Sequence, residues 1–294
     1  MKPFYMYSIV IVLFLISVFL LSYPFISNYL MGINQSSEVQ AYGQDMQKVD
    51  DEQILKERKE AEEYNKSLLG NVVLTDPFDP GIEPVKDYEY ERLLNLSDNL
   101  VMASIEIPVI DINLPIYHGT SDEVLQKGVG HLQKTSLPIG GKGTHCVLTG
   151  HTGLSSASLF TDLNLLKKND VFLIHCLNDT LAYRVDQIKI VEPDNTSDLR
   201  IDAEHDYVTL VTCTPYGINS HRLLVRGTRI PYEEKDELIA VGQSRAGEST
   251  WMSEYKKALW AGGIIFALII ITFVIVKIIL KKRRRKVQVE ATDT

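Results

Sequence analysis

The hydrophobic residues of this chain form three patterns. Long apolar runs lie near both ends, a polar segment with loosely helical spacing follows the first run, and the middle of the chain alternates apolar and polar residues. The apolar runs cover 7–21 and 258–280, and a helix of about 20 apolar residues crosses a bilayer. Only Lys277 interrupts the second run. The pattern therefore predicts a membrane-spanning helix at 258–280.

The first apolar run has two interpretations. Its short apolar core after Lys2 is typical of a cleaved signal peptide. Residues 22–32 nevertheless continue apolar and aromatic, and no small-x-small cleavage site follows the run. We therefore predict an N-terminal transmembrane anchor or uncleaved signal over 1–32, with a cleaved signal as the alternative.

Basic residues directly after the second run predict the topology. Residues 281–286 read KKRRRK, and such clusters stay on the cytoplasmic side of a spanning helix. We expect a multi-pass protein of the cell membrane, in contact with lipid through two spanning helices. Its middle would be extracellular and its tail, 281–294, cytoplasmic. A nuclear or nucleic-acid tag is the alternative for the basic run.

The extracellular region is acidic. The whole chain carries −8, with +1 in residues 1–30 and +5 in residues 277–294, which leaves −14 for residues 31–276. A protein that binds nucleic acid by releasing counterions needs clustered positive charge. We therefore expect no nucleic-acid partner.

Two segments precede the alternating region. Residues 33–70 are rich in Glu, Gln, Lys and Asp, with loosely helical apolar spacing. This pattern predicts a stalk of one or two polar helices, with a disordered linker as the alternative. In 71–86, prolines and a glycine exclude a regular helix or a central strand. We predict a loop there with Phe78 at its tip.

Residues 87–232 have the pattern of a β protein. Alternating segments are separated by turn residues, and Pro108 and Pro115 punctuate the first of them. The expected strands are 102–117, 145–149, 170–176, 181–191, 207–213 and 222–230, with short helices at 121–128 and 158–168. Many strands with few helices predict a mainly β fold, as a mixed or closed barrel. Residues 233–257 then form a linker to the second spanning helix.

Three cysteines, Cys146, Cys176 and Cys213, cannot all pair within one chain, so an extracellular free thiol is expected. Cys146 and Cys176 lie in apolar strand patterns, which is typical of small buried hydrophobes. Cys213 instead ends the strand VTLVTC and precedes the strand-breaking turn 214–217. The chain then returns to a strand that begins at Arg222. Because a guanidinium beside a thiol favours the thiolate and can donate to an oxyanion, Cys213 is the candidate nucleophile.

A catalytic thiol needs a partner that acts as base or acid, and seven histidines are candidates. His151 follows an expected strand and lies in the sequence TGHTG, as suits a loop that opens at a sheet margin. The local pattern ranks His151 first and leaves its competitors open. These are His118, His131, His145, His175, His205 and His221.

Several motifs together resemble the class C sortases, which assemble pili in Gram-positive bacteria. The motifs are GVGHL at 128–132, TSLP at 135–138, TGHTG at 149–153, TLVTC at 209–213 and TCTPYG at 212–217. The resemblance covers most of 71–232, and a C-terminal spanning helix also fits that class. It implies a closed sortase-type β-barrel over 87–232. In that barrel Cys213 is the nucleophile, His151 the general acid/base, and Arg222 stabilises the oxyanion or the substrate.

The resemblance also implies a lid over the active site that carries an Asp-Pro-aromatic sequence. The loop 71–86 contains Asp76, Pro77 and Phe78. Carried over, Asp76 pairs with Arg222, and the Phe78 ring covers the thiol with a sulfur–aromatic attraction of about 0.3–1.5 kcal/mol. The alternative is a plain proline-rich loop that packs Phe78 into the core.

By the same resemblance, the chain is a cysteine transpeptidase. It would cleave an LPxTG-like sorting motif after Thr, form a thioacyl-enzyme and transfer the acyl group to a lysine of a pilin subunit. No cofactor is implied, and no Cys/His cluster or EF-hand spacing indicates a metal site. The alternatives are a wall-anchoring sortase, an L,D-transpeptidase-like enzyme, which would carry His-Gly shortly before its Cys, and a non-catalytic membrane-anchored adhesin.

Overall fold

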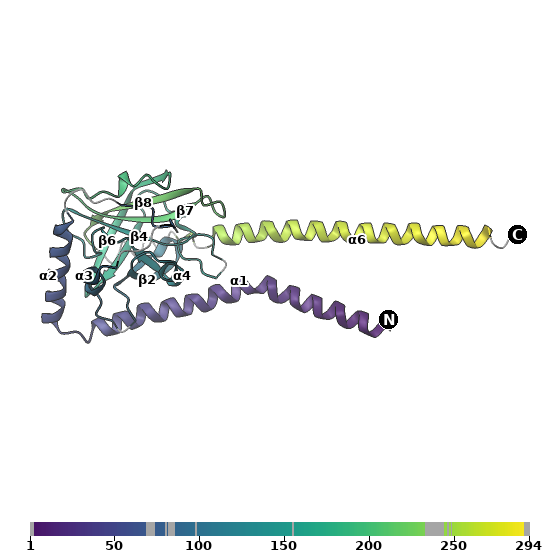
Figure 1. The fold of residues 1–294 in the computed structure, drawn as a ribbon, viewed down its shortest axis with the longest axis horizontal. Helices are drawn as coiled ribbons and strands as arrows, with labels where there is room; N and C mark the ends of the chain where they lie inside the picture. The colour runs from purple at the N-terminus through teal and green to yellow at the C-terminus, as the bar shows by residue number, and fades with distance from the viewer. Residues whose placement is uncertain are drawn as a thin grey trace. The chain divides into compact units, whose positions relative to one another are not determined.

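The computed structural model describes residues 3–68, 74–79, 81, 86–97, 99–154, 156–232, 244–245, 247 and 249–290. Its contacts divide the chain into two compact units, Met1–Gly247 and Glu248–Thr294. The first unit contains all the strands of the described chain, together with every residue predicted for the active site. Figure 1 shows these strands wrapped into a barrel with α2 and α3 beside it.

Eight strands close into a barrel in the order β1-β2-β3-β4-β7-β8-β6-β5. The strands are β1 (Ala103–Ile107), β2 (Ile112–His118), β3 (Val129–His131), β4 (Thr144–Thr149), β5 (Val171–Cys176), β6 (Asp179–Val191), β7 (Asp206–Thr214) and β8 (His221–Ile230). Neighbours are antiparallel except for the parallel pairs β2–β3 and β4–β7. The predicted mainly β fold with a closed barrel is confirmed.

The first predicted strand, 102–117, is divided in two. A 3₁₀ turn, η1 (Pro108–Ile110), separates β1 from β2 and ends at Asp111 in the left-handed conformation, with φ 54°. The proline at the start of η1 cannot donate a ladder hydrogen bond, which explains the break. Strand β3 was not predicted, because three residues are too few to show an alternating pattern.

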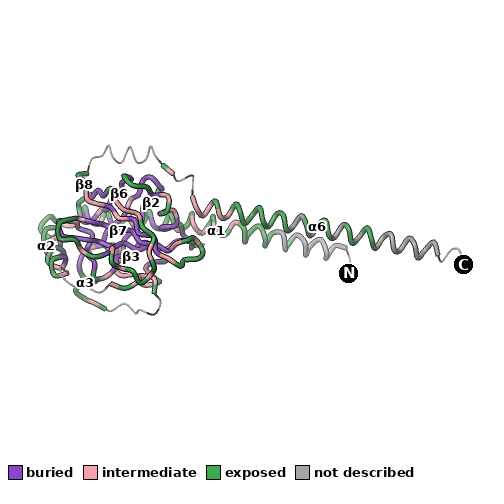
Figure 2. The backbone as a smooth tube through the Cα atoms, turned by 90° about the horizontal axis from the view of Figure 1, so that it is seen from above, coloured by how far each residue is buried: buried purple, intermediate pink, exposed green. Residues whose placement is uncertain are grey.

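Alternation along the strands sorts the apolar side chains into an inner and an outer cluster. Leu148 of β4 and Leu210 of β7 belong to the main core, whereas Val147 and Val211 belong to a separate cluster on the outer face. Successive side chains of a strand point to opposite faces. Thr149 therefore shares the outer face with Val147. Figure 2 shows the buried residues gathered in the barrel.

The N-terminal helix, α1 (Pro3–Met46), combines a membrane-length apolar segment with a contact on the barrel. Its part Leu15–Met46 contains an 18-residue stretch apolar enough to cross a membrane, with a mean hydropathy of 1.4 over that stretch. Near its end, Tyr42 is buried and donates a hydrogen bond of 3.1 Å to the Met102 carbonyl. The predicted N-terminal anchor is thus one continuous helix that ends on the barrel.

The segment predicted as a polar stalk forms the end of α1 and then α2 (Asp51–Ser67), which lies against the barrel. Asp50 caps α2 by accepting a hydrogen bond from the Gln53 N–H at 2.7 Å. Ile54 and Ala61, one face of α2, are buried. The sequence pattern predicted the helix, and the structure adds its packing on the barrel.

Two buried polar side chains of α2 bind backbone groups of the barrel unit. Glu57 accepts a hydrogen bond of 2.6 Å from the Leu94 N–H. The Asn65 amide accepts from the Leu137 N–H at 2.7 Å and donates to the Leu137 carbonyl at 3.3 Å. These bonds satisfy buried backbone groups that no strand pairs.

The short helix α3 (Tyr88–Arg92) follows the lid loop and places one buried tyrosine in the barrel unit. Tyr90 Oη lies 2.8 Å from His131 Nδ1 and accepts a hydrogen bond of 2.9 Å from the Gly119 N–H. Helices α2 and α3 therefore fix the chain on both sides of the lid loop.

One predicted helix is confirmed and the other is wrong. Helix α4 (Asp122–Lys127), capped by Ser121, occupies the predicted segment 121–128. The segment 158–168 contains only the 3₁₀ turn η2 (Leu163–Leu165). The cause is local packing: Leu159 has φ 40°, outside the helical region, and the Phe160 ring packs so close to Gly150 that a Cβ there would lie 2.7 Å from it. A further 3₁₀ turn, η3 (Ser197–Leu199), precedes β7.

The chain returns to the barrel after β8 through Arg245. Its guanidinium donates to both carboxylate oxygens of Asp170, at 2.6 and 3.1 Å, and to the Leu165 carbonyl at 3.1 Å. The Arg245 N–H donates to the Val109 carbonyl at 2.6 Å. Much of the predicted linker, 233–243 together with 246 and 248, lies outside the described residues.

The second unit is the helix α6 (Thr250–Glu290). It runs through the predicted span 258–280 and through the basic residues that follow, and 291–294 lie outside the described residues. The rings of Trp251 and Tyr255 stack near its start, with centroids 5.7 Å apart. The candidate membrane span found among the described residues is the one in α1.

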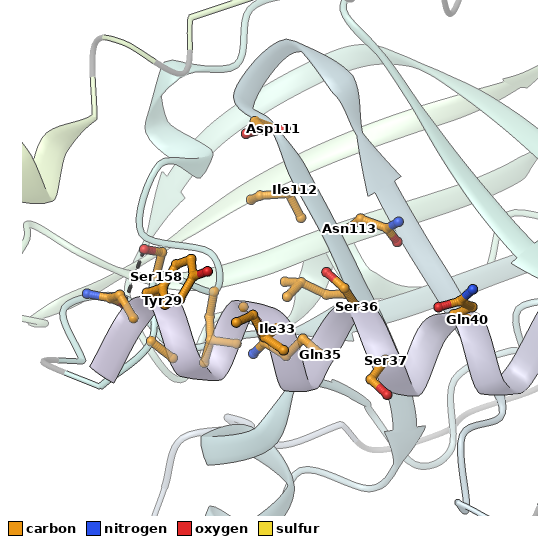
Figure 3. Close-up of a pocket in the computed structure, with 15 residues that line it drawn as sticks. Tyr29, Ile33, Gln35, Ser36, Ser37, Gln40, Asp111, Ile112, Asn113 and Ser158 are labelled. Atoms are coloured by element: carbon orange, nitrogen blue, oxygen red, sulfur yellow. Dashed lines mark hydrogen bonds between the residues drawn. The ribbon is translucent and has the colours of Figure 1, made fainter. Parts of the chain in front are cut away.

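A groove of about 690 Å³ runs between α1 and the start of β2 (Figure 3). Amide and hydroxyl side chains, including Gln35, Ser36, Gln40 and Asn113, lie along it, and Ser158 from the loop after β4 closes one end. None of the residues predicted for the active site lines this groove.

Candidate active site

Cys213 and Arg222 are directly opposite each other on β7 and β8. The register of this antiparallel pair matches Cys213 with Arg222 and Thr214 with His221. The connecting turn is closed by the N–H groups of Ile218 and Asn219, which donate to the Pro215 carbonyl at 3.0 and 2.9 Å. The predicted return of the chain to Arg222 is therefore present, and the barrel backbone sets the spacing of the two residues.

Arg222 is held by Asp76 of the lid loop. Arg222 Nε and Nη2 donate to the two carboxylate oxygens of Asp76 at 2.8 and 2.6 Å, a bidentate geometry. Arg222 Nη1 donates to the Asn219 and His221 carbonyls, each at 3.0 Å. The Arg222 and Asp76 side chains are only 11% and 12% exposed. The ion pair expected from the resemblance is present.

Phe78 contacts both Arg222 and His151. The Arg222 guanidinium carbon lies 5.1 Å from the Phe78 ring centroid, within cation–π range. The His151 ring centroid is 5.5 Å from that of Phe78, with an angle of 42° between the planes. Phe78 and Leu74 also pack against the outer apolar cluster of the barrel. The predicted arginine and histidine therefore both contact the Phe78 ring of the lid.

The loop that carries His151 is fixed by hydrogen bonds on both sides. Before it, Gly150 N–H donates to the Val211 carbonyl at 3.1 Å, and Thr212 Oγ1 donates to the Gly150 carbonyl at 2.7 Å. After it, the His151 carbonyl accepts from the Phe160 N–H at 3.0 Å. Because Val211 and Thr212 immediately precede Cys213, the backbone near the nucleophile also positions the histidine loop.

Burial keeps the thiol and the imidazole of this site neutral. The pKa of Cys213 is raised to about 11, chiefly by desolvation; the Arg222 charge lowers it and the Asp76 charge raises it further. The pKa of His151 is lowered by desolvation, against the opposing charge of Asp122. With Asp76 and Phe78 packed beside Arg222 and His151, little of Cys213 is therefore thiolate at neutral pH.

The other cysteines and histidines lie elsewhere. Cys146 and Cys176 are buried at 3% and 1% exposure, and burial raises the pKa of both thiols, as expected for inert core residues. His131 and His145 are buried and hydrogen-bonded, and desolvation lowers the pKa of each to about 4. His118, His175, His205 and His221 bind the Leu93 carbonyl, Glu106, Asp202 and Glu192, respectively.

Two supporting residues were missed by the sequence analysis. Thr212 and Phe160 hold the His151 loop, yet neither carries a chemical group that suggests a site. Thr212 gave no distinct signal in the sequence, because the same strand also carries Thr209 and Thr214. The lid residues 71–73, 80 and 82–85 lie outside the described residues. Within the described chain, no group of three or more His, Cys, Asp or Glu residues could bind a metal ion.

Comparisons with known proteins agree with this geometry. A sortase domain family model matches residues 105–230, which include His151, Cys213 and Arg222. The chain is 50% identical to the solved structure of sortase C-1 from Actinomyces oris, with a TM-score of 0.59 and coverage of 62% of this chain and 99% of that one. It is 49% identical to sortase C-1 from Streptococcus pneumoniae, with a TM-score of 0.63 and coverage of 67% and 100%.

A third solved structure, described as a pilus-related sortase C of Group B Streptococcus, is 47% identical, with a TM-score of 0.61 and coverage of 66% of this chain and 97% of that chain. Each of these proteins is matched over almost its whole length, at an identity far above that at which only the fold is shared. Sequence, barrel and neighbours agree, so the chain belongs to the sortase family of cysteine transpeptidases, within class C.

Proposed function

We propose that this chain polymerises pilin subunits, with Cys213 as the nucleophile, His151 as the general acid/base and Arg222 as the group that stabilises the oxyanion or orients the peptide. The observation that carries the proposal is the placement of Cys213 opposite Arg222 with His151 on the neighbouring strand connection. The similarity to a structure described as pilus-related supports the pilus as the product.

The reaction proceeds in two acyl transfers. The Cys213 thiolate attacks the carbonyl after Thr in an LPxTG-like sorting motif, so a C–S bond forms and the Thr–Gly peptide bond breaks. Imidazolium of His151 gives its proton to the departing Gly amine. A pilin lysine amine then attacks the thioester, His151 takes the proton, and an isopeptide bond replaces the C–S bond. No cofactor takes part.

Asp76, Pro77 and Phe78 act as a lid in this proposal. While Asp76 binds Arg222, the guanidinium cannot serve a substrate oxyanion. The thiol, at 8% exposure, is shielded as well. Opening frees Arg222 and hydrates Cys213, which lowers the pKa of the thiol. The same motion therefore exposes the nucleophile and activates it.

The chain is proposed to cross the membrane twice, through α1 and through 258–280 of α6. The basic run 281–286 keeps the C-terminus cytoplasmic, and the barrel is then extracellular, where pilin subunits are displayed. In this arrangement 1–32 anchors the chain, 33–70 supports the barrel, 71–86 forms the lid, 87–232 is catalytic, and 233–257 links to the second span.

The test is a search for the acyl-enzyme. We would incubate the full chain in detergent micelles, with Asp76→Ala to open the lid, with an LPxTG-type peptide and look for an adduct by mass spectrometry. An adduct on the peptide that contains Cys213 is expected, and it should be absent in Cys213→Ala and retained in Cys146→Ala. Absence of any adduct with peptides of several motif variants would refute the proposal.

A further inference from the structure

Thr149 has an unusual hydrogen-bond status. Within the described part of the chain, its Oγ1 is the buried side-chain oxygen or nitrogen atom that lacks a hydrogen-bond partner. The residue is completely buried. A nearby hydroxyl on the same sheet, Thr209 Oγ1, is paired with His145 Nε2 at 2.7 Å. Buried polar groups are nearly always paired in native proteins, so an exception calls for a functional explanation.

The register of the barrel places this hydroxyl on the face of the nucleophile. Thr149 pairs with Val211 in the parallel β4–β7 ladder, and paired residues point to the same side of a sheet. Val211 belongs to the outer apolar cluster. Cys213 lies two residues further along β7, so it shares this face, at a distance along the strand of about 7 Å.

The lid packs over the same face. Leu74 and Phe78 contact the outer cluster that contains Val147 and Val211, the neighbours of Thr149 along β4 and across the ladder. The Phe78 ring also contacts His151, two residues after Thr149. A peptide that replaces the lid on this face would therefore pass over Thr149.

We propose that the Thr149 hydroxyl donates a hydrogen bond to a main-chain carbonyl of the bound peptide substrate, within two residues of the carbonyl that Cys213 attacks. This inference rests on the proposed function. An extended peptide presents a carbonyl about every 3.3 Å, so one lies within reach of a group about 7 Å from the thiol. Valine would fill the same volume, and only the hydroxyl adds a polar contact to the apolar floor formed by Val147, Val211 and Leu224.

The unpaired hydroxyl should also affect the relative stability of the resting protein and of its complex with the peptide substrate. In the resting protein it is desolvated without compensation, and in the substrate complex it is paired. Removing the hydroxyl should therefore stabilise the resting protein and weaken the substrate complex. If Thr149 had a purely structural role, its replacement would lower both the stability and the substrate affinity, or would change neither.

The experiment compares Thr149→Val with Thr149→Ser and with the control Thr209→Val, in the full chain in detergent micelles. Acylation by an LPxTG-type peptide is measured in an Asp76→Ala background, and thermal unfolding in the otherwise unchanged chain. We expect Thr149→Val to lower kcat/KM about five- to tenfold through KM, and Thr149→Ser and Thr209→Val to leave it close to the starting value. We expect the unfolding midpoint to rise in Thr149→Val and to fall in Thr209→Val.

Equal kcat/KM in Thr149→Val and its parent would overturn the inference, and so would a lower unfolding midpoint of Thr149→Val. The rate of Cys213 alkylation by iodoacetamide serves as the control for an intact active site, and it should be the same in Thr149→Val and its parent. A changed rate would mean that the lower kcat/KM comes from a disturbed active site, and it would overturn the inference. Failure of the parent to acylate refutes the proposed function, and with it this inference. The two failures are therefore distinguishable.

Discussion

The lid and helix α2 both attach the N-terminal part of the chain to the barrel, but their contacts differ in kind. The described lid residues, 74–79, bind through the Asp76–Arg222 ion pair, the packing of Leu74 and of the half-buried Phe78 ring, and a hydrogen bond of 3.4 Å from Thr196 Oγ1 to the Leu74 carbonyl. Helix α2 buries Ile54 and Ala61 and adds polar bonds within the buried interface. The lid is therefore held by a small contact at the edge of the barrel, whereas α2 is held by residues that belong to the hydrophobic core.

The partners of these bonds differ, and the difference makes the lid contact the easier of the two to replace. The lid ends on a side chain, Arg222, which can bind another acceptor when Asp76 leaves. Helix α2 binds backbone N–H groups of Leu94 and Leu137, which would remain buried and unpaired if Glu57 or Asn65 moved away. The proposed gate therefore depends on a side-chain partner that can exchange Asp76 for another acceptor.

The largest expected effect comes from Asp76→Ala. With the lid released, the pKa of Cys213 should fall from about 11 toward the ordinary value of 9.0, because hydration removes the main cause of the shift and the Asp76 charge is gone. At pH 7.5 a fall of two units raises the thiolate fraction about 100-fold. The pH profile of Cys213 alkylation by iodoacetamide measures this fall in the pKa of the thiol.

The control for this measurement is Asp79→Ala, in the same loop, where Asp79 accepts a hydrogen bond from the Gly81 N–H. It should leave the midpoint of the profile near 11. Cys146 and Cys176 should stay unmodified in both variants, because they are buried in the core. A profile that is the same in Asp76→Ala and the parent would contradict the gating role.

Asn65→Ala tests the permanent contact. Loss of the amide leaves the buried Leu137 N–H unpaired, while the Leu137 carbonyl keeps the hydrogen bond of 2.8 Å from the Ile139 N–H; the free energy of unfolding should fall by about 1–3 kcal/mol. Chemical denaturation measures this change, and the exposed Asn95→Ala should alter stability by less than about 0.5 kcal/mol. Cys213 alkylation should stay slow in Asn65→Ala. Rapid alkylation would mean that α2 also takes part in the gate.

Tyr90→Phe examines the support on the other side of the lid. The variant removes the hydroxyl that lies beside His131 Nδ1 and accepts from the Gly119 N–H, so unfolding free energy should fall by about 1–3 kcal/mol. The exposed Tyr88→Phe is the matched control. An effect equal to that of Tyr88→Phe would show that the buried bonds contribute nothing net.

Phe78→Ala should have the smallest effect. The ring contributes a cation–π contact with Arg222 of about 0.5–1 kcal/mol, so its loss should raise Cys213 alkylation about two- to fivefold. Phe78→Trp keeps an aromatic face and should alkylate at the parental rate. If Phe78→Ala exceeded Asp76→Ala, the ring and not the ion pair would be the main closure.

Much of the barrel could be predicted because β4, β5, β7 and β8 are short, largely apolar runs bounded by turn residues, as is typical of strands buried on both faces. The proximity of Cys213 and Arg222 could be predicted from the short turn between their strands. Chemistry alone did not select His151, because its loop is positioned by Thr212 and Phe160, which are distant in sequence or chemically ordinary. The family resemblance supplied both His151 and the Asp76 pairing.

One wrong helix and one packing contact that the sequence did not predict have a shared physical origin. The segment 158–168 looked helical because its apolar residues fall near a helical spacing. In the structure, however, Phe160 packs on Gly150 and the chain bends to support the histidine loop. The prediction of polar helices over 33–70 did not include their packing, because charged positions dominate there, although Ile54 and Ala61 of α2 are buried against the barrel unit. In both places tertiary contacts outweighed the local pattern.

The return of the chain through Arg245 has a mechanical consequence. Any tension transmitted along the backbone from the C-terminal helix reaches the Arg245–Asp170 contact before it reaches β8. Asp170 also accepts a hydrogen bond from the Lys167 N–H, so the load spreads into the turn before β5.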